Sequence, residues 1–491
     1  MKVFVYEKVN FKRIPVMYYV LLYILLLIII IPLQPVGDDW ASIPILYFDW
    51  ELLKPDALWR PFQHLWAIMQ GSYINSFPII NHIEVVTMHI ISLYCLETFG
   101  LMLGLEKKSL YFSLLFFTVS PACLGTLLSI DAMNQTALPL GLIGTIIYIQ
   151  RTGVRKYAGW LLCSILAVLW KESGIVWFML TPFINEMFYL KKWKSGSYRR
   201  RLCSLMLNWG IGFLFVLLYF IVRFSWAGNM NLGATDGVRY EVSFSIFDLI
   251  RNFMMLLGIT FSSIDTLAFF VFPRNYLLLS ITVVISVVFT GLLFVFFLKK
   301  MKDKNVLIIL LFLLFSLLCV SFPFCIIEHP SELYAHTPLF FTALIVGVLL
   351  NVKTWTSPVK IILGLFIVTS VFVDIRKWDA MYESGKKAED IGLMIKSQTQ
   401  TPPKDVLVIY IPDENGYSVF YQNSVIASGY GRSSMKYFDY EYPLKMDLYP
   451  MSIEYENRIT EKDIHRITES MKKRYDSIWL MQNDSVVVIN K

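Results

Sequence analysis

Residues 14–34 read IPVMYYVLLYILLLIIIIPLQ, and Gly37-Asp38-Asp39-Trp40 follows shortly after them. The first stretch is almost uninterrupted hydrocarbon and is long enough to cross a bilayer as a helix. It is too long for the apolar core of a signal peptide and has no small-residue cleavage site, so we expect a retained anchor. The adjacent carboxylates and Trp40 then lie where this helix leaves the membrane, since tryptophan is enriched at the membrane interface.

The composition of the whole chain agrees with this start. The 491 residues are 56% hydrophobic and only 16% charged, with a mean hydropathy of +0.56. Soluble domains carry about 25% charged residues, so the chain is predicted to be a polytopic α-helical membrane protein. The net charge of +7 comes from basic residues in short loops between apolar runs. That distribution indicates membrane topology, and we expect no nucleic-acid partner.

Apolar runs of spanning length predict eleven transmembrane helices. They lie near residues 14–34, 78–98, 109–128, 134–150, 156–170, 175–190, 203–224, 276–298, 305–326, 337–352 and 359–375. The segment 247–272 is also apolar, but Arg251 and Asp265 interrupt it. A crossing there would move the basic residues 299–304 to the outer side, so we interpret it as a re-entrant or interfacial element, with a full span as the alternative.

Lysine and arginine concentrate in alternate loops, which predicts the orientation of the chain. The basic loops lie around residues 2–13, 107–108, 151–156, 191–201, 299–304 and 353–360. Because positively charged loops stay on the cytoplasmic side, the N-terminus is predicted inside and Asp38-Asp39 outside. Residues 1–375 form the predicted membrane module. Residues 376–491 are predicted to form a small extracytoplasmic α/β domain, with helical spacing at 379–398 and 460–475 and strands at 404–411, 477–481 and 485–490.

The cysteine and histidine residues give no clear metal motif. The six cysteines (Cys95, Cys123, Cys163, Cys203, Cys319 and Cys325) lie in or beside apolar runs and are predicted to be small buried hydrophobes, without a disulfide framework or zinc site. His82 and His89 are seven residues apart on one helix face and are interpreted as packing or hydrogen-bonding residues. Glu328-His329 and His336 could complete a metal site with Asp38 or Asp39, so a bound metal ion is kept as an alternative.

Several polar motifs interrupt the first 190 residues. They are Asp38-Asp39 after the first span, Trp59-Arg60-Pro61 followed by Pro78-Ile79-Ile80-Asn81-His82 and His89, Ser120-Pro121 with Asp131–Gln135, and Leu169-Trp170-Lys171-Glu172-Ser173-Gly174. This combination resembles the GT-C class of membrane glycosyltransferases, which take sugars from polyprenyl-phosphate carriers. The outer turn between the third and fourth spans departs from O-mannosyltransferase-like members, which often carry His, Glu and Arg there.

The resemblance implies a function. Size, span number and outer domain are similar to those of bacterial enzymes that decorate O-antigen, including prophage-type glucosyltransferases that use undecaprenyl-phosphate glucose. An inverting transfer of a hexose such as glucose to a surface glycan is therefore expected, at the outer face of the bacterial cytoplasmic (inner) membrane. The implied partners are a lipid-linked sugar donor, a glycan acceptor, membrane lipid, a flippase and a donor-synthesising glycosyltransferase.

Such a transfer needs a base and cations. A carboxylate takes the proton of the acceptor hydroxyl, and positive charge holds the leaving phosphate. We expect Asp38 to be the base, while Asp39 orients the acceptor or binds a divalent ion. The expected substrate-binding residues are Arg60, His64, Lys171, Glu172, Arg223 and Arg239.

Most of these residues could also serve the structure of the protein and have no role in the reaction. The two aspartates could merely keep the end of the first helix in water. Arg223 could extend to the lipid headgroups, and Lys171-Glu172 could be an ion pair at a helix end. Glu84 lies within the second predicted span, where an ionisable group usually faces a cavity or a partner.

Two other functions are compatible with a chain of this kind. An O-antigen ligase or polymerase should carry a large arginine-rich outer loop late in the chain, whereas the acids here come early. A lipid-linked glycan transporter or flippase should show paired half-segments and charges near the membrane centre. Here the ionisable residues concentrate at the outer ends of spans, which favours chemistry at the membrane surface.

Overall fold

The computed structural model describes most of the helical part of the chain and the strands near its end. The described residues are 13–33, 60–62, 65–66, 77–128, 133–188, 198–227, 244–265, 268–269, 275–327, 334–398, 405–411, 445–449, 469–471, 473–482 and 485–490.

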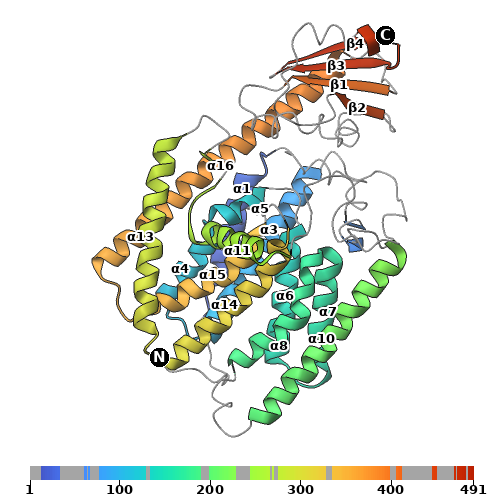
Figure 1. The fold of residues 1–491 in the computed structure, drawn as a ribbon. Helices are drawn as coiled ribbons and strands as arrows, with labels where there is room; N and C mark the ends of the chain where they lie inside the picture. Colours follow the sequence, from blue (N-terminus) through green and yellow to red (C-terminus); the bar gives the residue numbers. More distant parts are fainter. Residues whose placement is uncertain are drawn as a thin grey trace.

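The described chain forms a bundle of helices with a small sheet beyond one end (Figure 1). Its helices are α1 (Val16–Ile30), α3 (Phe77–Met102), α4 (Lys107–Thr118), α5 (Pro121–Leu128), α6 (Met133–Gln150), α7 (Val154–Trp170), η4 (Glu172–Val176), α8 (Trp177–Phe188), α10 (Tyr198–Ala227), α11 (Ile246–Phe261), α13 (Tyr276–Lys300), α14 (Lys304–Cys325), α15 (His336–Leu349) and α16 (Ser357–Gln398). A helix overlaps each apolar range that was predicted to span. Helices satisfy their backbone hydrogen bonds internally, as a lipid environment requires.

Five described helices are long and apolar enough to cross a membrane, judged by length and composition. They comprise Ile79–Met102, Tyr198–Ser225, Tyr276–Lys300, Lys304–Cys325 and Ser357–Glu383, and three shorter apolar helices comprise Val16–Ile30, Thr136–Gln150 and His336–Leu349. The expected total of eleven crossings stays a prediction.

The single span expected at 109–128 is in fact two helices. α4 ends at Thr118, and α5 starts at Pro121. Proline has no backbone N–H and is well suited to the first position of a new helix, so the Ser120-Pro121 pair ends one helix and begins the next. Helix α5 then packs against α3, α15 and α16.

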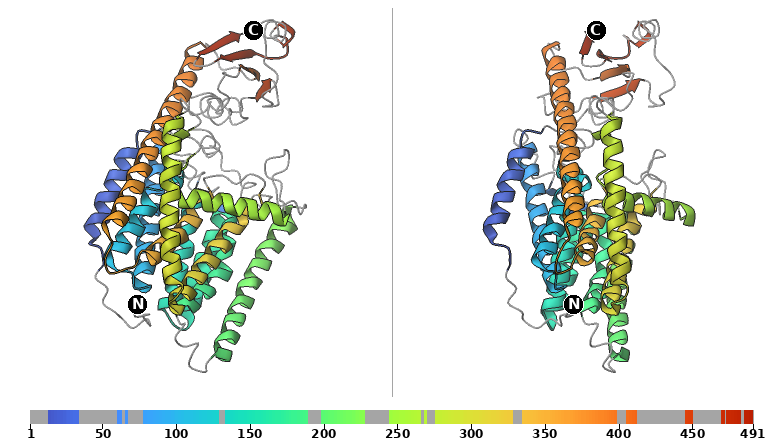
Figure 2. Two further views of the ribbon diagram at one scale, coloured as in Figure 1. Left: turned by 60° about the vertical axis from the view of Figure 1, so that its left-hand side comes forward. Right: turned by 90° about the vertical axis from the view of Figure 1, so that its left-hand side faces the viewer.

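Helix α11 lies across the bundle instead of running along it, near the end of α10 (Figure 2). Apolar side chains on one side of α11 are exposed, including Ile246, Ile250 and Met254. On the other side, the buried Asn252 side chain donates hydrogen bonds of 3.0 and 2.8 Å to the carbonyl oxygens of residues 325 and 327, at the end of α14. This arrangement is the one expected of an interfacial element in the predicted segment 247–272.

Small residues let α6 and α7 approach closely. A Cβ atom added to Gly159 would lie 2.4 Å from the Ile147 side chain, and one added to Gly144 would lie 2.8 Å from the Cβ of Cys163. Without a hydrophobic driving force in lipid, such close packing is a main source of helix association. It fixes α7, whose C-terminal end leads into the candidate site.

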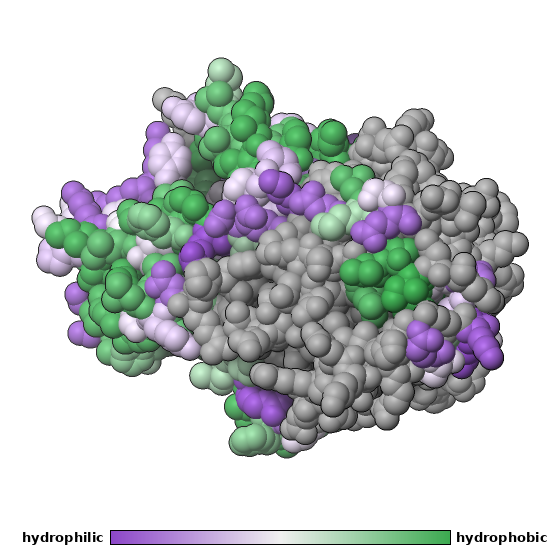
Figure 3. Space-filling view, turned by 90° about the horizontal axis from the view of Figure 1, so that it is seen from above, coloured by the Kyte–Doolittle hydropathy of each residue, from purple (hydrophilic) through white to green (hydrophobic). Residues whose placement is uncertain are grey.

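Large apolar side chains face outward on the outer helices. Examples are Leu207 on α10, Leu277 and Val287 on α13, and Phe372 on α16, each at least 59% exposed. Viewed from the sheet end, hydrophobic side chains dominate much of the described rim (Figure 3). Contiguous exposed apolar surface of this kind marks a lipid-facing or partner-facing side.

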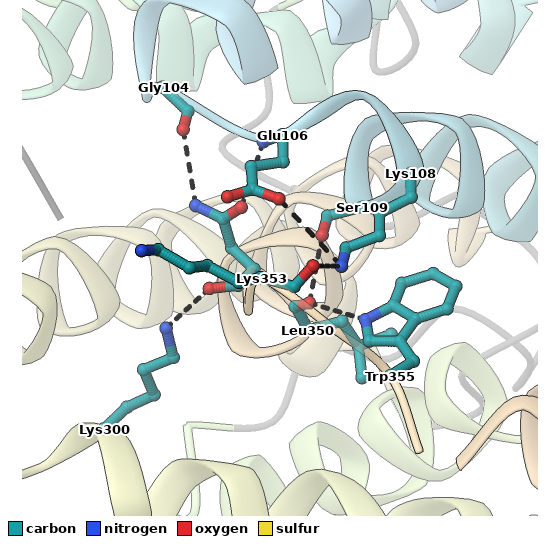
Figure 4. A network of polar contacts seen from close by, with 9 residues as sticks. Gly104, Glu106, Lys108, Ser109, Lys300, Leu350, Lys353 and Trp355 are labelled. Atoms are coloured by element: carbon teal, nitrogen blue, oxygen red, sulfur yellow. Dashed lines mark hydrogen bonds and ion pairs between the residues drawn. The ribbon is translucent and has the colours of Figure 1, made fainter. Parts of the chain in front are cut away.

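A polar network joins the helix turns at the end of the bundle away from the sheet (Figures 1 and 4). The Asn351 side chain accepts a 3.0 Å hydrogen bond from the backbone N–H of Glu106, and the backbone carbonyl of Asn351 accepts one of 2.8 Å from the Lys300 side chain. Lys108 donates to the carbonyl of Lys353. Three of the basic loops that were predicted to share one side therefore meet at one end of the described bundle.

The strands form a four-stranded sheet in the order β2-β1-β3-β4. They are β1 (Asp405–Ile411), β2 (Lys445–Tyr449), β3 (Ser477–Gln482) and β4 (Ser485–Asn490). β1 is parallel to β2 and β3, whereas β3 and β4 are antiparallel. The strands predicted at 404–411, 477–481 and 485–490 are confirmed, while β2 was not predicted. Most of the predicted helix 460–475 lies outside the described residues, and the expected domain boundary at 375/376 falls within the continuous helix α16.

Candidate functional site

The chain turns sharply where α7 gives way to η4, and this turn presents Lys171 and Glu172. Lys171 is extended, with φ −150° and ψ 138°, and η4 then folds back against the end of α7. A Cβ atom on Gly174 would lie 2.4 Å from the backbone carbonyl carbon of Ala167, so only glycine allows this close approach. The last residue of the Leu169–Gly174 motif, Gly174, is therefore required by close packing of the backbone. The two charged residues of the motif, Lys171 and Glu172, lie at the turn.

Glu172 forms an ion pair with Arg60, a residue 112 positions earlier. The Arg60 Nε donates to the Glu172 Oε1 over 2.8 Å, and the two side chains are 17% and 22% exposed. Burial by itself would raise the pKa of the Glu172 carboxyl. Arg60 and the neighbouring Lys171 outweigh that effect and hold its pKa below the ordinary value. Glu172 is therefore ionised at neutral pH and fixes the position of Arg60.

Helix α10 brings Arg223 to the same place. The Tyr219 hydroxyl, one helical turn before Arg223, lies within electrostatic reach of Glu172, Arg223 and Arg60. Tyr219 packs against the side chains at the end of α7, including Val168. Arg223 is only 4% exposed, and its Nε has no hydrogen-bond partner among the described residues. A buried arginine with an unused donor is well suited to binding an anion.

Lys171 extends toward Tyr334, which precedes α15. The Lys171 Nζ lies 5.7 Å from the centre of the Tyr334 ring, within the range of a cation–π interaction. Tyr334 is itself stacked on Phe324 at the end of α14, with ring centres 4.9 Å apart. Lys171 is 8% exposed, so its charge is held inside the bundle end and not in free solution.

We call Arg60, Lys171, Glu172 and Arg223 the cationic cluster. Among the described residues, three positive charges surround one carboxylate in a largely buried setting. Arginine side chains are well suited to bidentate contact with phosphate oxygens, and a lysine adds a further positive charge. The cluster can therefore stabilise a phosphate or a phosphate leaving group.

The structure thus joins four of the six predicted substrate-binding residues. The alternative in which Arg223 extends to the lipid headgroups does not fit its burial. The other predicted site residues (Asp38, Asp39, His64 and Arg239) lie outside the described residues. Tyr219 and Tyr334 were not predicted. Tyr219 could have been found, because residues four apart on a helix share a face and Arg223 was already a candidate.

Two polar residues of α3, His82 and Glu84, have hydrogen-bond partners within the described bundle. His82 Nε2 lies 3.1 Å from the carbonyl oxygen of Leu33, which confirms its predicted hydrogen-bonding role. Glu84 is 8% exposed and accepts a 3.1 Å hydrogen bond from the Thr136 hydroxyl. The partner predicted for Glu84 is therefore Thr136 on the neighbouring helix α6.

Comparison with known proteins gives a likeness in fold. No family model matches the sequence, and no curated protein matches it. Two solved structures are similar along almost the whole chain: the crystal structures of ArnT from Cupriavidus metallidurans bound to undecaprenyl phosphate and in the apo state. The identities are 11% and 12% and the TM-scores 0.47 and 0.49, and each match covers 96% of this chain and 97% of ArnT. ArnT belongs to the GT-C class. The likeness concerns the course of the chain and assigns no role to any residue.

Proposed function

We propose that this protein is a membrane glycosyltransferase that moves a sugar from a polyprenyl-phosphate carrier to an acceptor hydroxyl. The observation that carries the proposal is the cationic cluster, in which Arg60, Lys171 and Arg223 come together with Glu172 at a largely buried place. A polyprenyl phosphate carries its negative charge at the end of an apolar chain. A buried cationic site at the end of a lipid-facing helical bundle suits both parts of such a molecule.

The transfer follows from these charges and from the predicted aspartates. The acceptor oxygen attacks the anomeric carbon from the side opposite the phosphate, which inverts its configuration. Asp38 takes the hydroxyl proton, and the bond between the anomeric carbon and the phosphate oxygen breaks. The leaving polyprenyl phosphate gains negative charge, which Arg60 and Arg223 stabilise more strongly than they stabilise the donor.

In its finer form, the proposed donor is an undecaprenyl-phosphate hexose such as glucose and the acceptor is a surface glycan such as O-antigen. The reaction takes place on the outer face of the bacterial inner membrane. A flippase would deliver the donor after a separate glycosyltransferase has made it. These details rest on the sequence motifs and their resemblance to O-antigen-modifying enzymes.

The first test compares the surface polysaccharide of cells with and without this gene by mass spectrometry. We expect the repeat units to differ by the mass of a single sugar. Loss or shortening of the entire polymer would instead indicate a ligase or polymerase.

The second test uses the purified protein in detergent with a labelled lipid-phosphate sugar and isolated acceptor glycan. A glycosyltransferase needs no separate compartments, so transfer should continue in micelles, whereas a flippase would show none. Asp38→Asn should lower the rate about 10²-fold or more, as expected for the loss of a positioned general base. Asp39→Asn should have a smaller effect if that residue orients the acceptor, and an equal one if it holds a required divalent ion. Near-normal transfer by both variants would remove the aspartates from the mechanism.

A further inference from the structure

Three potential metal ligands meet inside the bundle, apart from the cationic cluster. They are His89 from the middle of α3, Cys123 from the first turn of α5 and His336 at the start of α15. One ligand atom from each residue lies within 4.8 Å of the other two, and all three side chains are 0% exposed. Their spacing along the chain does not predict that they meet, because 213 positions separate Cys123 from His336.

Their polar atoms are poorly satisfied without a ligand. His89 Nε2 and both ring nitrogens of His336 are buried with no hydrogen-bond partner among the described residues. Leaving a polar group buried and unpaired costs about 1–3 kcal/mol. An ion bound to one ring nitrogen of His336 would supply the partner that this nitrogen lacks.

The spacing of the best-defined pair fits shared coordination. The Cys123 Sγ lies 3.5 Å from the His89 Nδ1. For an ion with metal–sulfur and metal–nitrogen bonds of about 2.3 and 2.0 Å at a tetrahedral angle, the two ligand atoms are about 3.5 Å apart. A ligand atom of His336 lies within 4.8 Å of both other residues.

The surrounding side chains would hold the ligand rings in place. The Phe117 ring stacks on His89, with centres 5.4 Å apart and planes at 4°, and it lies 5.4 Å from the ring of His336. Asp374 and Lys377 of α16 lie within electrostatic reach of Cys123.

We propose that His89, Cys123 and His336 form a buried binding site for a thiolate-preferring metal ion, of the class of Zn²⁺ or Cu⁺. Two imidazoles and one thiolate are the ligand types that these ions favour, whereas Mg²⁺ and Ca²⁺ require oxygen ligands. The thiol proton is released when the ion binds. Because the site joins α3, α5 and α15, the ion would tie together three helices far apart in the sequence. This proposal is independent of the proposed function.

The test measures metal content directly. The full-length protein, purified in detergent, is loaded with Zn²⁺ or, under anaerobic reducing conditions, with Cu⁺, and then passed through a desalting column. Elemental analysis should give about one equivalent of one of these ions per chain. Cys123→Ser and His336→Gln should each lose most of this equivalent. The matched control Cys95→Ser removes an equally buried cysteine from α3 and should keep it.

A second measurement holds even if the variants fail to fold. X-ray absorption spectra of the loaded wild-type protein should show one sulfur neighbour and at least two nitrogen neighbours of the ion. Absence of bound metal from the wild-type protein, or a spectrum without sulfur, would overturn the proposal. Retention of the ion by a folded Cys123→Ser variant would overturn it as well.

Discussion

Replacement of Arg60 by alanine tests the cationic cluster most directly. The change removes one of the three cations of the cluster and leaves Glu172 beside Lys171. A hydrogen bond to a charged group contributes about 1.5–3 kcal/mol. Since 1.4 kcal/mol corresponds to a factor of ten, we expect the affinity for undecaprenyl phosphate to fall roughly 10- to 150-fold.

Arg60→Ala should lower the free energy of unfolding by less than it weakens binding. This loss of stability should also depend on pH, because it involves the ionisation of Glu172. The pKa of Glu172 is held below its ordinary value. The ion pair therefore contributes stability above the unfolded pKa of about 4.3 and loses it as the pH falls through the lower folded value. Wild type and Arg60→Ala should accordingly converge in melting temperature under acidic conditions.

A matched control exists at another ion pair. Arg201 and Glu186 form a pair of 2.7 Å in which the side chains are 19% and 8% exposed. Arg201→Ala thus removes a comparable interaction from a region predicted to be cytoplasmic. The assay is equilibrium binding of undecaprenyl phosphate to protein in lipid nanodiscs, at two salt concentrations. Wild-type affinity in a folded Arg60→Ala protein would refute the reasoning, and so would an equal loss in Arg201→Ala.

Other substitutions and fusions test the fold around the site. Gly174→Ala should lower stability by about 1–3 kcal/mol because its methyl group meets backbone atoms, whereas Gly291→Ala, with open space around it, should leave the melting temperature unchanged or slightly higher. Asp265→Asn leaves its buried lysine partner without that counter-charge and should cost on the order of 3 kcal/mol, seen as reduced accumulation in membranes and a lower melting temperature. A reporter that is active only outside the cytoplasm should work after Lys491 and fail after Lys194; the opposite result would reverse the predicted topology.

The helices could be predicted because the length and hydrophobicity of each apolar run indicate a helix without reference to the rest of the chain. Helix α14, at Lys304–Cys325, matches the range 305–326 almost residue for residue, since charged residues end the run on one side. The break at Pro121 was visible in the sequence, but average hydrophobicity across 109–128 concealed it. The crosswise course of α11 followed from charge distribution and not from its hydrophobicity, which by itself would have favoured a full span.

The individual residues of the candidate site could be predicted from the sequence. Which of these residues contact one another could not. Arg60, Glu172 and Arg223 each differ from their apolar surroundings, and a charged residue there indicates a partner or a ligand. Helical periodicity gives the face on which a side chain lies, but it does not say which helix that face meets. The Arg60–Glu172 pair depends on the fold-back of η4 at Gly174, and the place of Arg223 depends on the packing of Tyr219 against α7. The His89–Cys123–His336 group depends in the same way on contacts among α3, α5 and α15. Since both clusters arise where separate helices meet, a packing change at the end of α7 should alter phosphate binding without touching any charged residue.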